Sequence, residues 1–181
     1  MSDSTNGARV SGTVFGGTTG NVLSYVVDDD GRSASLLGAF TRAGGATWRG
    51  APADDRLRNA QATASEIANL EARGRYPFEQ PRLYARIEEG ERRIAVFEKL
   101  EVHLPLDAVT IGAAEATVVL RRLGRFAGAE DLKVTIDAPS ESLQHAMLRS
   151  ILDGVRVGDP TIVRRIHSEP RVIVEPRRRT A

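Results

Sequence analysis

The sequence predicts an α+β fold in which a mostly antiparallel sheet, made of an N-terminal meander and a central hairpin, packs with about three helices. Segments that alternate between apolar and polar residues are separated by glycine- and aspartate-rich stretches, which is typical of antiparallel strands and their turns. Other segments carry apolar residues at helical spacing between a proline and a glycine. The two kinds of segment do not alternate strictly, which argues against a regular parallel α/β fold.

A β-meander is expected over residues 8–50. Its two separators, residues 16–21 and 28–32, consist of residue types that favour turns. Trp48 follows a pair of glycines and is expected to pack against the meander. The three expected strands are residues 10–15, 22–27 and 35–40.

The first helix is expected between Pro52 and Gly74. Proline is favoured at a helix start, and Asp54 and Asp55 complement the positive end of the helix dipole. Small and apolar residues recur there at helical spacing and form a stripe that can lie close against a sheet: Leu57, Ala60, Ala64, Ile67 and Ala68.

A hairpin is expected from residues 82–88 and 92–104, because both segments alternate with period two around a turn at residues 89–91. One face of the second strand is expected to be buried and carries Ile94, Val96, Leu100, Val102 and Leu104. The opposite face is expected to be half exposed or covered by a partner and carries Phe97, Lys99, Glu101 and His103.

The C-terminal half is expected to begin with a short strand at residues 109–111. Residues 113–126 fit both a helix and a strand, and the helix is favoured because the alanines near its start form helices readily and Gly128 supplies a stop. The remaining expected elements are a strand at 132–136, a helix at 139–154 and strands at 161–166 and 171–174.

The chain has 181 residues, of which 41% are hydrophobic, and this is enough to bury one sizeable core. A single domain is expected over residues 9–175, between a polar N-terminal arm (1–8) and a basic C-terminal tail (176–181). Its core should be aliphatic, with Trp48, Phe97 and Phe126 as the large fillers.

The absence of cysteine from the sequence excludes disulfide bonds, thiolate metal sites and cysteine nucleophiles, and it suits a reducing compartment. The N-terminus lacks the order of a signal peptide, and no apolar run approaches the ~20 residues of a membrane span. We therefore expect a cytoplasmic protein that makes no contact with membranes.

Arginine dominates the basic residues, and arginine binds phosphate and carboxylate groups in a bidentate manner. A net charge of +1 and an aromatic content of 5% make nucleic acid a less favoured partner than protein. The candidate residues for binding an anion or a partner are Arg121, Arg122, Arg125, Arg164, Arg165, Arg177, Arg178 and Arg179.

No motif of a known catalytic, metal or cofactor site is found. The glycines between residues 12 and 20 are not followed by the Lys-Ser or Lys-Thr of a phosphate-binding loop, and the acidic run 28–30 lacks the spacing of a calcium loop. His103, His145 and His167 have no neighbour at metal-ligand spacing. For acid–base chemistry the best candidate is His103, because Glu101 shares its strand face.

These observations favour a non-enzymatic interaction or assembly subunit of a larger cytoplasmic complex or particle, whose partners are other protein subunits or further copies of itself in a homo-oligomer. Neither a cofactor nor a metal is expected. The alternatives are a module that binds anions or nucleic acid through its arginines, and an enzyme with a composite site that the sequence does not reveal.

Overall fold

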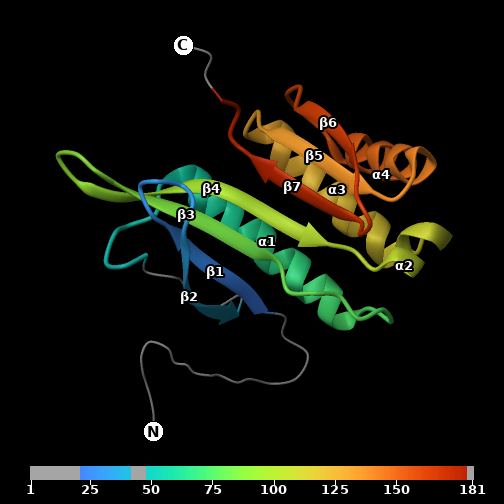
Figure 1. The fold of residues 1–181 in the computed structure, drawn as a ribbon, viewed down its shortest axis with the longest axis horizontal. Helices are drawn as coiled ribbons and strands as arrows, with labels where there is room; N and C mark the ends of the chain where they lie inside the picture. Colours follow the sequence, from blue (N-terminus) through green and yellow to red (C-terminus); the bar gives the residue numbers. More distant parts are fainter. Residues whose placement is uncertain (1–20, 42–47, 179–181) are drawn as a thin grey trace, which may run out of the picture. The chain divides into compact units, whose positions relative to one another are not determined.

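The computed structural model describes residues 21–41 and 48–178, which form seven strands and four helices (Figure 1). The predicted arm (1–8) and the predicted first strand (10–15) lie outside the described residues. In chain order the elements are β1 (Asn21–Val27), β2 (Ala34–Thr41), α1 (Asp55–Arg73), β3 (Arg82–Glu89), β4 (Arg93–His103), α2 (Leu106–Ile111), α3 (Ala114–Ala129), β5 (Lys133–Ala138), α4 (Glu141–Gly154), β6 (Thr161–Ile166) and β7 (Arg171–Glu175).

The strands form one mixed sheet in the order β2-β1-β3-β4-β7-β5-β6. The α+β prediction is confirmed, but the prediction of a mostly antiparallel sheet is wrong. The pairs β1–β3 and β5–β6 are parallel, whereas β1–β2, β4–β7 and β5–β7 are antiparallel. A helix lies in the chain between the two strands of each parallel pair, and such a crossover is what returns the chain to the same direction.

The fourth helix is α2, which replaces the short strand predicted at residues 109–111. The β-branched residues at this place favour a strand locally. The segment is nevertheless a helix that begins after the extended Pro105 and ends at Gly112, which lies in the left-handed region at φ 67° and donates its N–H to Ala108 O and Val109 O. The prediction of about three helices was therefore one too few, whereas the helix favoured at 113–126 is confirmed as α3.

The chain divides into two compact units, Met1–Arg73 with Gln80–Glu98 and Gly74–Glu79 with Lys99–Ala181. Unit 1 contains β1, β2, α1, β3 and the first part of β4. Unit 2 contains the last part of β4, α2, α3, β5, α4, β6 and β7. The single domain expected over residues 9–175 stays a prediction.

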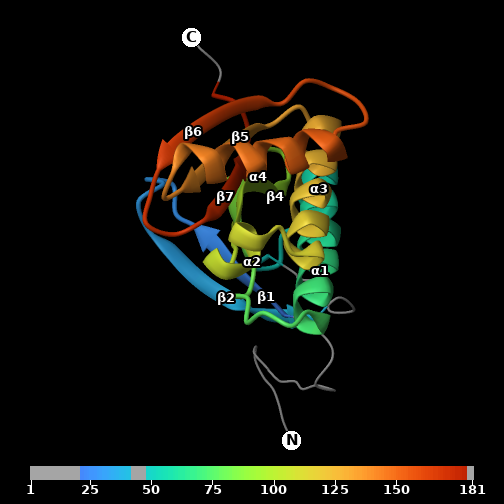
Figure 2. The same ribbon diagram turned by 90° about the vertical axis from the view of Figure 1, so that its right-hand side faces the viewer.

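In unit 1, helix α1 lies against β1 and β3 and carries the predicted stripe, all of which is buried (Figures 1 and 2). Trp48 and Phe97 are also buried, as predicted for the large core residues, and the expectation that Phe97 lies on a half-exposed strand face is wrong. The acidic run between β1 and β2 is a hairpin turn, in which Gly31 donates its N–H to Asp28 O at 2.8 Å and Arg32 donates its N–H to Asp30 Oδ1 at 2.8 Å.

The buried face of β4 differs from the predicted one. Ala95 and Phe97 are buried in its first part, whereas Leu100 and Val102 are buried in its last part. The alternation changes phase at Glu98 and Lys99, where two half-buried residues follow one another. The strict period of two used for the prediction therefore assigned Ile94 and Val96 to the wrong face.

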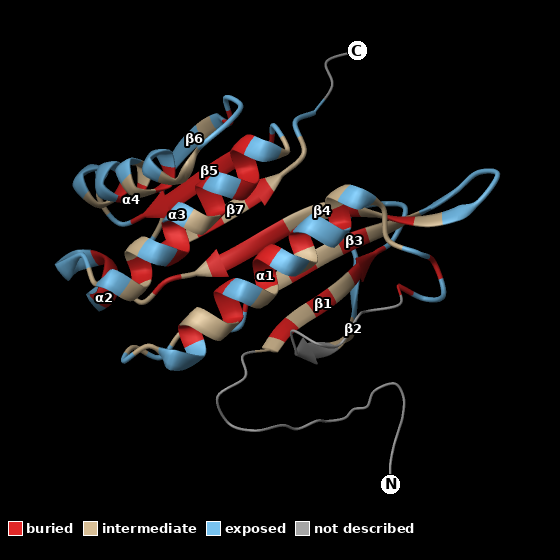
Figure 3. Ribbon diagram, turned by 180° about the vertical axis from the view of Figure 1, so that it is seen from behind, coloured by how far each residue is buried: buried red, intermediate tan, exposed pale blue. Residues whose placement is uncertain are grey.

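In unit 2, helices α3 and α4 pack against each other on one side of the strands (Figures 1 and 2). Five of the six residues of β5 are buried, whereas β7 alternates between buried and half-buried residues (Figure 3). Two glycines permit this packing. A Cβ at Gly124 would collide with the carbonyl oxygen of Ile151, and one at Gly154 would collide with the carbonyl oxygen of Arg121. The backbones of the two helices are thus in direct contact, which fixes α4 beside β5 and β6.

One buried acid was not foreseen. Glu71 continues the apolar stripe of α1 one turn beyond Ile67, is only 7% exposed, and has no hydrogen-bond partner on either carboxylate oxygen. Burial raises the pKa of Glu71 to about 9, so that its side chain is protonated at neutral pH.

We predict that Glu71→Gln stabilises the protein increasingly as the pH rises. The folded protein keeps this proton from the ordinary pKa of 4.5 up to about 9, whereas the unfolded chain releases it, so wild-type stability falls across this window. Urea unfolding should give similar stabilities at pH 5 and a gain of about 2–4 kcal/mol for the variant at pH 8. The control Glu91→Gln, in the exposed β3–β4 turn, should leave stability unchanged; an equal gain at both pH values would contradict the prediction.

Candidate functional site

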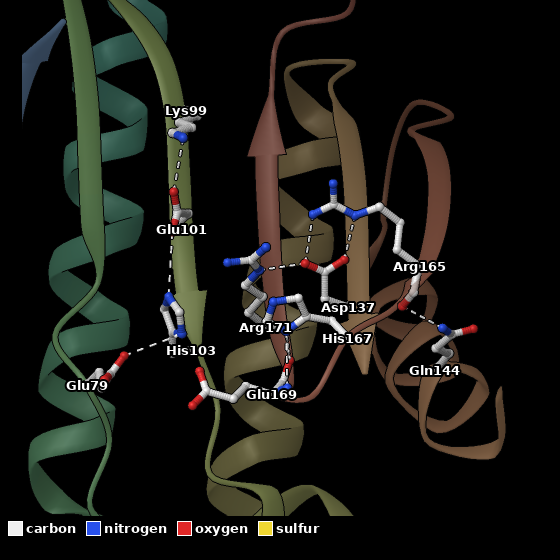
Figure 4. Close-up of polar contacts among 10 residues, drawn as sticks. All are labelled: Glu79, Lys99, Glu101, His103, Asp137, Gln144, Arg165, His167, Glu169 and Arg171. Atoms are coloured by element: carbon white, nitrogen blue, oxygen red, sulfur yellow. Dashed lines mark hydrogen bonds and ion pairs between the residues drawn. The ribbon is translucent and has the colours of Figure 1, made fainter. Parts of the chain in front are cut away.

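A row of charged residues crosses the face of unit 2 opposite α3 and α4. The strand registers place His103 opposite Arg171, Arg171 opposite Asp137, and Asp137 beside Arg165. Directly paired residues share a face of the sheet. The sheet therefore brings together four polar side chains from four strands, β4, β7, β5 and β6, and we call them the polar row (Figure 4).

Asp137 is the centre of the polar row. Its side chain is 0% exposed, and it accepts hydrogen bonds from Arg165 Nε and Nη2, both at 2.8 Å, and from Arg171 Nε at 2.5 Å. Burial would raise the pKa of Asp137, but the hydrogen bonds and charges of the two arginines outweigh burial and hold its pKa below the ordinary value. One carboxylate thus joins β5, β6 and β7.

A second chain of contacts runs along β4. Lys99 Nζ lies 3.1 Å from Glu101 Oε2, and His103 lies between two carboxylates, with Nε2 3.5 Å from Glu101 Oε1 and Nδ1 3.4 Å from Glu79 Oε2. The longer contact is an ion-pair distance without a hydrogen bond. Burial would raise the pKa of Glu101, but Lys99 and His103 outweigh burial and lower it.

Beside His103 lies a pocket of about 350 Å³, which we call the end pocket. Glu79, His103, Ser168 and Glu169 supply its polar side chains, and its walls include Pro77, Leu106 and Pro170. These residues come from three places: the segment before β3, the end of β4 with α2, and the β6–β7 turn. In Figure 4 the Glu169 side chain reaches from this turn toward the strand that carries His103.

The β6–β7 turn is held by local hydrogen bonds. Glu169 donates its N–H to His167 Nδ1 at 3.1 Å, and Leu104 donates its N–H to Pro170 O at 3.1 Å. His167 therefore supports the turn, and the turn is fixed to the chain that follows β4.

The arginines predicted to bind an anion or a partner are spread over several elements. Arg121, Arg122 and Arg125 lie on α3, and Arg164 and Arg165 lie on β6. Arg165 already holds Asp137, and Arg177, after β7, lies 3.0 Å from Asp131 and donates to Asp159 O. Arg178 is exposed, and Arg179 lies outside the described residues. Binding by this set stays a prediction.

The other candidates have separate places. The glycine-rich segment 12–20 lies outside the described residues, and His145 is exposed on α4. Among the residues that the structure describes, no group of three or more His, Cys, Asp or Glu side chains could hold a metal ion. None of the described helices is long and apolar enough to cross a membrane.

The comparisons with known proteins gave no match: no family model, no curated protein and no solved structure is significantly similar to this chain.

Sequence reasoning selected His103, Glu101 and Arg165 but missed the centre of the polar row and the end pocket. One sequence signal could have identified Asp137. Because Val134 and Ile136 alternate on one face of the strand, the next residue, Asp137, falls on the opposite face. Arg171 and Glu169 could not be assigned to the site, because the sequence does not show that β7 lies between β4 and β5.

We predict that Asp137→Asn destabilises the protein by about 2–4 kcal/mol at pH 7, because it leaves two arginines without their anion. This loss of stability is smaller than the cost of breaking a fully buried pair, since the side chain of Arg165 is half exposed. A carboxylate with a lowered pKa stabilises the fold above its ordinary pKa, and this contribution is lost as the pH falls through the folded pKa. The difference should therefore shrink below about pH 4.

Urea unfolding measures both effects. The control is Asp131→Asn, which removes an exposed partner of Arg177 and should cost less than about 1 kcal/mol. Equal costs for the two substitutions at pH 7 would show that Asp137 does not join the strands as described.

Proposed function

We propose that this chain is a non-enzymatic protein–protein interaction module that acts as an assembly subunit of a larger cytoplasmic complex or particle. The observation that carries the proposal is the end pocket, where two carboxylates meet apolar walls beside exposed apolar side chains of α2.

The chemistry of the end pocket suits a basic side chain of a partner protein. Glu79 and Glu169 are exposed carboxylates at the pocket, and prolines and leucines form its walls. Arginine and lysine combine a charged end with an apolar stem, and arginine is enriched at the energetically important centres of interfaces. A guanidinium or ammonium group would lie between the carboxylates while its stem covers the apolar wall.

The surroundings of the pocket favour a protein over a small molecule. Leu106, at the pocket, is 44% exposed, and Ile111, at the other end of the same short helix, is 67% exposed. Large apolar side chains at exposed positions beside a polar pocket are a common feature of interaction surfaces. A partner that inserts a basic side chain would also cover these two residues.

The contacts of Asp137 and Glu101 support recognition rather than turnover. Both oxygens of Asp137 are held by arginines, and Glu101 is held by Lys99. Groups that are satisfied by each other fix the shape of the site and are not poised to exchange protons with a substrate.

We predict that the double substitution Glu79→Gln and Glu169→Gln abolishes partner binding without changing stability, because both side chains are exposed. The measurement is quantitative capture of proteins from native lysate, with native mass from light scattering in parallel. The matched control, Asp153→Asn with Asp159→Asn, removes two exposed carboxylates of the same unit outside the pocket and should retain the partner. A protein that is monomeric and retains no partner in any form would overturn the proposal.

A second candidate function is acid–base catalysis by His103. The observation that favours it is the position of the imidazole at the end pocket between Glu79 and Glu101, at 3.4 and 3.5 Å. A carboxylate beside an imidazole can orient it toward a substrate.

If this candidate is correct, a panel of simple ester, phosphoester and amide substrates should include one whose turnover is lost by at least about a hundredfold in His103→Asn. The control His145→Asn changes an exposed histidine of α4 and should keep full activity. Turnover that survives in His103→Asn would assign the activity elsewhere.

A further inference from the structure

Strand β6 is the last strand of the sheet, and one of its two edges is open among the described residues. The other edge pairs with β5 in parallel, and Thr161 donates its N–H to Leu132 O while His167 donates its N–H to Ala138 O. Since a strand alternates the direction of its backbone groups, the N–H and C=O groups of Ile162, Arg164 and Ile166 point to the open edge.

The open edge of β6 is held in a fixed, extended form. Arg165 binds Asp137 of β5 with two hydrogen bonds, and Gln144 of α4, itself buried, donates its Nε2–H to Arg165 O at 2.6 Å. An edge that is already ordered loses little conformational entropy when a further strand pairs with it.

The side chains on the α4 side of β6 form a distinct pattern. Ile162 and Ile166 flank Arg164, and Ile166 is 64% exposed. Arg164 also lines a hollow of about 480 Å³ together with Glu141, Ser142, His145, Ala146 and Arg149 of α4. No ion pair holds Arg164 among the residues that the structure describes, and one carboxylate, Glu141, faces two arginines in the hollow.

We infer that β6 accepts an extended segment of a partner protein as a further strand, and that this segment carries an acidic residue with an apolar residue two positions before and after it. The acidic side chain would lie opposite Arg164 over the basic hollow, and the apolar side chains would cover Ile162 and Ile166. Opposite charges and apolar pairs on directly paired residues stabilise a sheet. The partner's pattern of an apolar, an acidic and an apolar residue at alternate positions is the same from either end of the segment. The segment can therefore pair with β6 in a parallel or an antiparallel direction.

A second copy of this chain fits less well as the occupant. Pairing β6 with another β6 around the middle of this face would place Arg164 opposite Arg164, and like charges on directly paired residues are destabilising. The inference rests on the proposed function, since it adds a partner contact to an interaction module, but it uses residues that do not line the end pocket.

The test uses the full-length protein and the blocked peptide acetyl-Thr-Val-Thr-Glu-Thr-Val-Thr-amide, with a second peptide in which Lys replaces Glu. In NMR titrations the Glu peptide should shift the amide signals of Ile162, Arg164 and Ile166 and should bind about tenfold more tightly than the Lys peptide. Arg164→Glu, an exposed change that should not affect folding, should reverse this preference.

Ile166→Pro removes an N–H that points to the open edge and none that pairs with β5, so it should weaken both peptides while the protein stays folded. Arg164→Glu with an unchanged preference, or amide shifts confined to residues around Glu79 and His103, would overturn the inference. The pocket variant Glu79→Gln with Glu169→Gln should bind the Glu peptide normally. Binding of the Glu peptide without capture of a lysate partner would refute the proposed function alone. Capture of a lysate partner without binding of the Glu peptide would refute the β6 inference alone.

Discussion

The Asp137 carboxylate is the constraint on which the rest of unit 2 depends. It lies on β5, between β7 and β6, is shielded from solvent, and is held by one arginine from each neighbouring strand. An isolated carboxylate at this place would be costly to bury, and two guanidinium groups offset that cost only in the correct register. A slip of one residue in β6 or β7 would move its arginine to the other face of the sheet. The cluster therefore selects the register of three strands.

That register positions both candidate binding surfaces. Because Arg171 begins β7, its bond to Asp137 fixes the turn that carries Glu169, and the bond from Leu104 to Pro170 fixes this turn beside the end of β4. On the other side, the two bonds of Arg165 hold β6 extended and leave Arg164 facing α4. One buried charge thus orders an acidic pocket at one end of the strands and a basic edge along the last strand.

Sequence reasoning recovered most elements because their signals are local. Apolar spacing and bounding glycines and prolines placed α1, α3 and α4, and alternation placed the hairpin and the C-terminal strands. It failed at two places. The strand expected at residues 109–111 is a helix that begins after Pro105 and ends at Gly112, and the phase of burial in β4 changes at Glu98 and Lys99. Glu71 stands four residues after Ile67, yet a glutamate on a helix is normally exposed, so periodicity alone did not mark it as buried.

The pairing of Asp137 with Arg171 depends on strand order, which no local pattern encodes. The parallel return through α4 places β6 outside β5, and β7 then turns back to the inner side. This order leaves β6, which carries two arginines, at the edge of the sheet and places β7 between two other strands. In the sequence the two strands look alike, because both are short and combine β-branched residues with arginine. The same topology that buries the Asp137 carboxylate therefore leaves the backbone of an arginine-bearing strand at the edge, and this exposed backbone is the basis of the recognition of acidic segments that we propose for β6.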